Sequence, residues 1–193
     1  MKIERFKAPT SRFLSVDKDI NQLCEMFMDN DRLCRLLYRT DSHPLDAENL
    51  TELEKIELLS KKYIRTMPKI TVDNQTLNYI IISFDNFVPT SNPEFRDNNI
   101  VIDIICHYDQ WMIQDGLLRP YRIAGEIDSM LDGSRFSGIG TLSFSKAHQL
   151  MVNGEYGGIG LEYLATHGED DKKHFANPND EILFLEEMKK GKS

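Results

Sequence analysis

The sequence has few of the residue patterns that carry enzyme or metal chemistry. Its three cysteines, Cys24, Cys34 and Cys106, are odd in number, lack CxxC spacing and sit among apolar neighbours. That pattern argues against a disulfide framework and indicates buried thiols in a reducing compartment. The five histidines lack the i, i+4 or HxH spacing that lets two imidazoles share one ion. We therefore expect no metal site.

Phosphate-binding and nucleophile motifs are missing as well. There is no GxxxxGK[ST] loop, and the glycine runs at 138–140 and 157–160 lack the lysine or the following helix that such loops need. There is no GxSxG turn that would expose a nucleophilic serine. The sequence therefore predicts no catalytic residue and no cofactor, and we expect a protein that is not an enzyme.

Long apolar runs and an excess of basic residues are also lacking. No run approaches the roughly 20 apolar residues that span a bilayer, and the first residues lack the apolar core of a secretory signal. Lys and Arg number 23 against 31 Asp and Glu, a net charge of -8, which disfavours general binding to phosphate backbones. We expect a protein that is made in the cytoplasm and kept there or in a particle assembled there, without contact to a membrane.

What the sequence does contain is a clear alternation of helical and strand-like segments. Helical spacing begins at Ser15 or Asp17, breaks near 29–31 and continues to about Tyr38, and an amphipathic helix with an acidic face follows over about 48–59. Pro120 and Gly133 bound another predicted helix. The remaining segments are predicted strands, at 77–84, 100–107, 141–145 and 158–164.

These segments predict an α+β fold made from two hairpins. The fold is a four-stranded, mostly antiparallel sheet with helices on one face and an additional N-terminal helical section. The Pro- and Asn-rich stretch at 85–99 is interpreted as an extended hairpin loop. The predicted organisation is one domain over 1–167, with a helical section at 15–66 and the sheet with its helix at 70–167, followed by a charged tail at 168–193 in which a short helix is predicted at Ile182–Met188.

One enzymatic alternative uses carboxylates. Asp103 lies inside an otherwise apolar strand, and a magnesium nuclease would need it to converge with Asp85, Asp109 or Glu126. The motif with a lysine two residues later is absent, since Ile104 and Ile105 follow. A position on the second face of the sheet is therefore preferred for Asp103.

The segment from Leu77 to about Leu164 resembles a known family. The strand IVIDIICHYDQW, the helix RPYRIAGEIDSMLDG and the strand EYGGIGLEYLATHG are similar to the tail-terminator (tail-completion) and related head-tail connector proteins of tailed bacteriophages. The long helical section at 15–66 and the tail depart from that pattern, which leaves another connector role open.

The resemblance implies a ring-forming structural protein of the virion, typically hexameric, at the head-tail junction. It would cap the tail tube, contact the tube protein and a head-completion or connector protein, and let DNA pass without specific binding. For such a role, exposed aromatics and arginine favour Phe87, Phe95, Arg96 and Trp111 as interface residues. The alternative is an adaptor domain that binds another protein through the 85–99 segment or the C-terminal helix.

Overall fold

The computed structural model describes residues 16–60, 63–66, 76–89, 95–135 and 140–168, and the α+β class is confirmed. Within these ranges three α-helices come before the first strand, and two short 3₁₀ helices and a fourth α-helix lie between the third strand and the fourth. Their bounds are α1 Val16–Asp29, α2 Asp31–Tyr38, α3 Glu52–Ser60, α4 Arg119–Leu131, η1 Tyr108–Gln110 and η2 Gln114–Gly116. The strands are β1 Ile64–Arg65, β2 Tyr79–Pro89, β3 Phe95–His107, β4 Ser143–Met151 and β5 Tyr156–Gly168.

The described strands form one sheet with the order β1-β2-β3-β5-β4. The two predicted hairpins, β2 with β3 and β4 with β5, are both antiparallel, and β3 also pairs with β5 in antiparallel fashion. The four-stranded prediction therefore holds for these strands. It missed β1, which pairs in parallel with Ile80 and Ile81 of β2 and makes the sheet five-stranded and mixed. Two residues are too short to give a periodic signal.

The interpretation of 85–99 as an extended loop is wrong. β2 continues to Pro89 and β3 begins at Phe95, so most of that stretch is strand. The register shifts between Asp85 and Val88, and Asn86 has a left-handed φ of 60°. A bulge of this kind accommodates an extra residue and lets pairing resume beyond it, which the turn-rich composition concealed.

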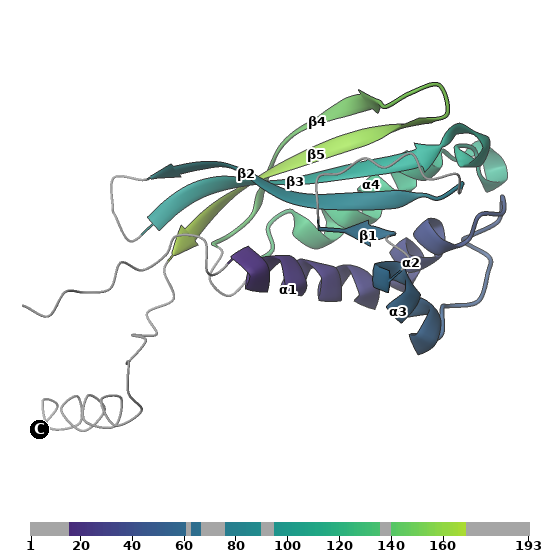
Figure 1. The fold of residues 1–193 in the computed structure, drawn as a ribbon, viewed down its shortest axis with the longest axis horizontal. Coiled ribbons are helices and arrows are strands. Elements are labelled where there is room, and N and C mark those ends of the chain that lie inside the picture. Colours follow the sequence, from purple (N-terminus) through teal and green to yellow (C-terminus); the bar gives the residue numbers. More distant parts are fainter. Residues whose placement is uncertain (1–15, 61–62, 67–75, 90–94, 136–139, 169–193) are drawn as a thin grey trace, which may run out of the picture.

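Helices cover one face of the sheet, as predicted (Figure 1). α1 contacts β2, while α4 lies against β3 and β5. Alternate residues of β3, among them Ile100, Ile102 and Ile104, are fully buried beneath this layer and join the main core. We call this the helix-covered face and the opposite one the open face. A smaller apolar cluster occupies the open face, made by Tyr79, Ile81, Ile105 and Tyr156.

The predicted helix limits are close to those observed. The break near 29–31 is confirmed, because Asn30 is the N-cap of α2 and its side chain accepts a hydrogen bond from the Leu33 amide. Pro120 lies in the first turn of α4, and Gly133, with φ 73°, follows its end. The three cysteines are free and buried, as expected.

The predicted acidic face of the helix at 48–59 is only part of its exposed surface. α3 buries Leu58, yet Leu53, Ile56 and Leu59 are exposed beside its glutamates. The helix is therefore apolar on two sides. The predicted helix at Ile182–Met188 and the tail beyond Gly168 lie outside the described residues, and the domain limits stay a prediction.

Arg119 joins the N-terminal helices to the sheet. Its side chain is fully buried, and its guanidinium donates hydrogen bonds of 2.7 to 2.8 Å to four backbone carbonyls. These carbonyls belong to Leu36, Arg39, Asp41 and Gln110, three of them at or just beyond the end of α2. The last carbonyls of a helix have no partner within it and carry partial negative charge, so a cation is favourable there.

We expect Arg119→Met to destabilise the chain by about 3 to 5 kcal/mol, because two buried and two part-buried carbonyls lose their donor while the apolar stem is kept. Urea unfolding followed by circular dichroism measures this loss. Arg122→Met on the exposed side of the same helix is the matched control, with a change within about 0.5 kcal/mol. Equal stability of the two variants would contradict the role given to Arg119.

Candidate functional site

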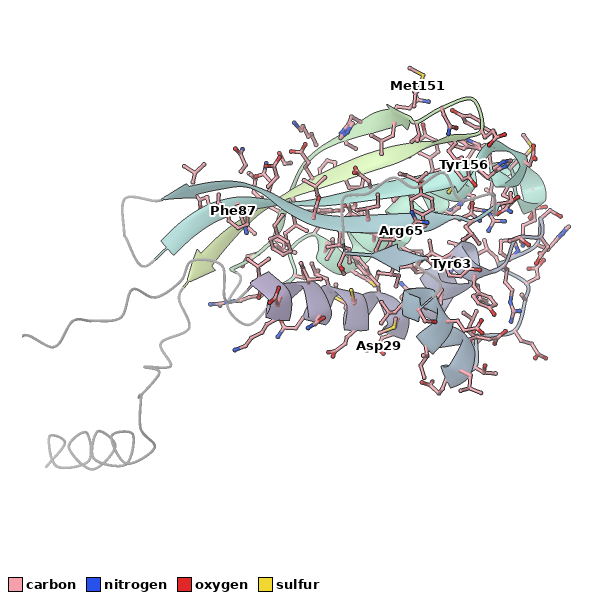
Figure 2. All side chains as sticks on the ribbon, viewed as in Figure 1. Asp29, Tyr63, Arg65, Phe87, Met151 and Tyr156 are labelled. Carbon is pink, nitrogen blue, oxygen red and sulfur yellow. The ribbon has the colours of Figure 1, made fainter. Side chains whose placement is uncertain are left out.

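The four predicted interface residues do not come together. Phe87 lies near the end of β2, whereas Trp111 follows the opposite end of β3. Val88, next to Phe87, pairs with Asp97 of β3, and Trp111 follows His107 at the far end of that strand. Asp97 and His107 are ten residues apart along β3, a distance of about 33 Å. Figure 2 shows Phe87 and Tyr156 at opposite ends of the sheet, and His107 is the ladder partner of Tyr156.

Each of these residues has its own surroundings. Phe87 is half-buried and lines a shallow groove of about 350 Å³ between the start of α1 and β2, together with Ile20 and Phe84. Phe95 and Arg96 begin β3 and are strand residues, not loop residues as expected. Trp111 is half-buried and packs against Tyr108, with ring centroids 5.3 Å apart and the ring planes tilted by 40°. Their role in an interface stays a prediction.

The carboxylates of the nuclease alternative do not converge. Asp103 lies on the open face, as preferred, four residues along β3 from Asn99, the partner of Asp85. Glu126 lies on α4 on the other side of the sheet, where it accepts a hydrogen bond from Asn30 and pairs with Arg32. Among the described residues no group of three or more His, Cys, Asp or Glu is placed to hold a metal ion.

A polar cluster on the open face surrounds Gly160. A Cβ added at Gly160 would lie 2.5 Å from the His148 ring and 3.0 Å from Oδ1 of Asp103, so the absence of a side chain lets both approach from β4 and β3. Burial raises the pKa of the Asp103 carboxyl, while charge on His148 lowers it and Glu162 raises it further. Glu162 itself pairs with Lys146 at 3.1 Å.

Because the Asp103 pKa is raised in the folded chain, its unfavourable ionisation should reduce stability as pH rises above the ordinary value of 3.8. We expect Asp103→Asn to be more stable than the wild type near pH 7, with the difference shrinking towards about pH 4. Urea unfolding at several pH values measures this. Asp115→Asn, at an exposed position, controls for the loss of one negative charge. A pH-independent difference would contradict the burial argument.

β4 is exposed on both faces of the sheet. Eight of its nine residues are exposed and Leu150 is half-buried, and β5 is its neighbour on one edge, with no strand on the other edge among the described residues. Lys146 is the single charged residue of β4 and there is no proline in it. Lysine and bulges both limit the pairing of an edge strand with other chains, and β4 has Lys146 and a register shift between Phe144 and Lys146. The exposed side chains of β4, more than its backbone edge, are therefore available to a partner.

The helix-covered side of β4 presents large apolar side chains. Register with β5 places Phe144, Ala147 and Met151 on this side, where Phe144 is 45% and Met151 87% exposed. Gly157 of β5 is the ladder partner of Met151. The Tyr108 hydroxyl lies over Gly157, 2.6 Å from the position that a Cβ would take there, so Tyr108 is a neighbour of Met151 on this side of the sheet. Figure 2 shows Met151 at the margin of the molecule. We call Tyr108, Tyr121, Phe144, Ala147 and Met151 the β4 surface.

α4 bounds the β4 surface on one side. Asp128 accepts a hydrogen bond from the Tyr163 hydroxyl at 2.8 Å, and Asp132 accepts one from the Phe144 amide at 2.9 Å. Tyr121 is exposed and lies seven residues before Asp128, so it shares this side of the helix. The helix layer therefore ends beside β4 without covering it.

α3 presents a second exposed apolar surface at the other edge of the sheet. Leu53, Ile56 and Leu59 are 77%, 61% and 40% exposed, and their three-residue spacing places them along one side of the helix, opposite Leu58. α3 contacts β1 and α2, and Tyr63 after it bonds Leu58. We call Leu53, Ile56 and Leu59 the α3 stripe.

Sequence reasoning missed both surfaces. No pattern in the sequence indicates the β4 surface, because the alternation in SFSKAHQLM predicts a strand but does not show which of its two sides a helix covers. The sequence does indicate the α3 stripe, since the apolar residues of ELEKIELLS are spread over more than one face of a helix. Arg119 was also missed, although an arginine directly before the helix-starting Pro120 was visible.

Taken together, the described residues form an α+β protein with two exposed apolar surfaces. A protein-family comparison matches residues 30–164 to the YomW family, from the N-cap of α2 into β5. The chain therefore belongs to the YomW family, a Bacillus phage-type gene family, and is a phage-associated protein. No curated protein matches the chain. No helix in the described ranges has the length and apolar character needed to cross a membrane.

Proposed function

We propose that this phage protein is a structural component of the virion that forms a ring, of six copies by preference, at the head-tail junction. The ring caps the tail tube and joins it to the head as a tail terminator or a related neck connector. Its partners are the tube protein and a head-completion or connector protein. Membership of a phage family and the resemblance of the segment 77–164 to terminator proteins support this role.

The observation that carries the proposal is the exposure of β4. This nine-residue edge strand is exposed on both faces and leaves large apolar side chains in water, Phe144 and Met151 among them, and the lysine and the bulge in it limit pairing through its backbone but do not cover these side chains. In a closed ring each copy covers the exposed surface of its neighbour, so no copy has such a surface left in contact with water. The net charge of -8 fits a passage through which DNA moves without adhering.

A phage that lacks this gene tests the role. We expect lysates with DNA-filled heads and unattached tails, because the joining ring is missing, and electron microscopy of negatively stained particles measures this. Supplying the wild-type gene from a plasmid should restore joined virions. Intact, infectious virions without the gene would contradict the structural role and favour the adaptor alternative, in which the protein binds a partner outside the particle.

A further inference from the structure

The β4 surface lies beside α4 and has room for one more helix. Phe144 and Ala147 are exposed on the helix-covered side of β4. On the side of α4 that is next to them, Gly125 has no side chain, and a Cβ built there would meet nothing within 4 Å. A further helix with an apolar side could therefore pack here, extend the helix layer over β4 and remove apolar surface from water.

The end of the β4 surface at Phe144 is acidic. Asp132 lies at the C-terminal end of α4 and accepts a hydrogen bond from the Phe144 amide, and Asp128 accepts one from the Tyr163 hydroxyl. Neither carboxylate has a Lys or Arg partner in the described part of the chain, and α4 has no basic residue in its last turn. Because the last carbonyls of a helix also carry partial negative charge, cations are favourable at this place.

A segment of complementary composition occurs near the C-terminal end of the sequence, outside the described residues. The helix predicted there from sequence has Ile182, Leu185 and Met188 at three-residue spacing, which places them along one side. Three lysines follow and no acidic residue comes after Glu187; the lysines are Lys189, Lys190 and Lys192. A helix over 180–190 would therefore have an apolar side and a basic end.

The chain is long enough to place this segment on the β4 surface of the same copy. Ala147 pairs with Leu161, which is seven residues before Gly168 at the end of β5, a distance of about 23 Å. The eleven residues 169–179 can span up to about 36 Å. A tethered segment meets such a surface at an effective concentration in the millimolar range, which favours it over a free partner.

The dimensions of the two surfaces also agree. Ile182 and Met188 are six residues apart, which is about 9 Å along a helix. Phe144 and Ala147 are three residues apart along β4, with a register shift between them, a distance of about 7 to 10 Å. One helix can therefore contact both strand residues with its apolar side.

We propose that residues 180–190 form a helix on the β4 surface of the same copy, with Met188 at Phe144 and Ile182 at Ala147. This direction puts the lysines that follow Met188 beside the two carboxylates of α4. The consequence for assembly rests on the proposed function, because a neighbouring copy must displace this helix before it can cover the β4 surface in a ring. The segment thus keeps the surface closed until assembly.

Cross-linking within the full chain tests the contact. Ala147→Cys combined with Glu181→Cys brings two thiols together in the docked helix, and the native cysteines do not compete because all three are buried. Leu164→Cys with Glu181→Cys is the matched control, since Leu164 is exposed on the open face and lies closer to the end of β5. We expect a short bismaleimide to join the first pair, within one chain, at least about tenfold faster than the control pair. Mass spectrometry of the digested product measures this.

Reversing charge at the end of the helix tests the orientation. Lys189→Glu with Lys190→Glu should release the helix and lower the cross-linking rate to that of the control pair, because like charges then face each other. Lys172→Glu with Lys173→Glu makes the same change in net charge outside the helix and should leave the rate unchanged. Release exposes the β4 surface, so light scattering with size-exclusion chromatography should show rings at a concentration at least about fivefold lower than for the wild type.

Each contrary outcome overturns a separate part of the inference. Equal cross-linking rates in the two cysteine pairs would overturn the docked helix and leave the proposed ring standing. A cross-link formed mainly between two chains would overturn the assignment to the same copy, because the helix would then lie on a neighbour. Cross-linking as expected, with a released variant that is monomeric at every concentration, would uphold the contact and overturn both its role in assembly and the self-assembling ring.

Discussion

The buried guanidinium of Arg119 is the interaction on which the relative placement of the helices and the sheet depends. It binds carbonyls at the end of α2 and after β3 at once. No carboxylate lies among its hydrogen-bond partners; burial lowers its pKa while Cys106 and Asp41 oppose that shift. An arginine keeps its charge under such conditions, and leaving it or its four acceptors unpaired would be costly.

The position of α2 then determines what remains exposed. α2 packs against α4, and Asn30 and Arg32 at its start both contact Glu126 of α4. α3 follows α2 and is held against it by the hydrogen bond from Tyr38 to Glu57. Leu58 is thereby directed inward, and the three apolar residues of the α3 stripe are left facing outward. The exposure of the α3 stripe is therefore a consequence of how the helical section is anchored.

Much of the fold followed from periodicity. The apolar run at 100–107 predicted β3, Pro120 and Gly133 bounded α4, and the two hairpins predicted antiparallel pairing; the structure confirms all three. The same local reasoning failed where distant residues decide the outcome. β1 is a strand because β2 offers it an edge, and 85–89 is a strand because a bulge accommodates Asn86.

The sequence by itself determined the class of fold, the buried thiols and the lack of recognisable catalytic and phosphate-binding motifs, because these depend on composition and on spacing along the chain. Only the tertiary structure decided which apolar residues are core and which are surface. Leu58 and Ile56 have the same local character, yet one is buried and the other exposed, since burial depends on which element packs alongside. Likewise Phe144 and Met151 are exposed because the helices packed on the sheet contact mainly its other strands.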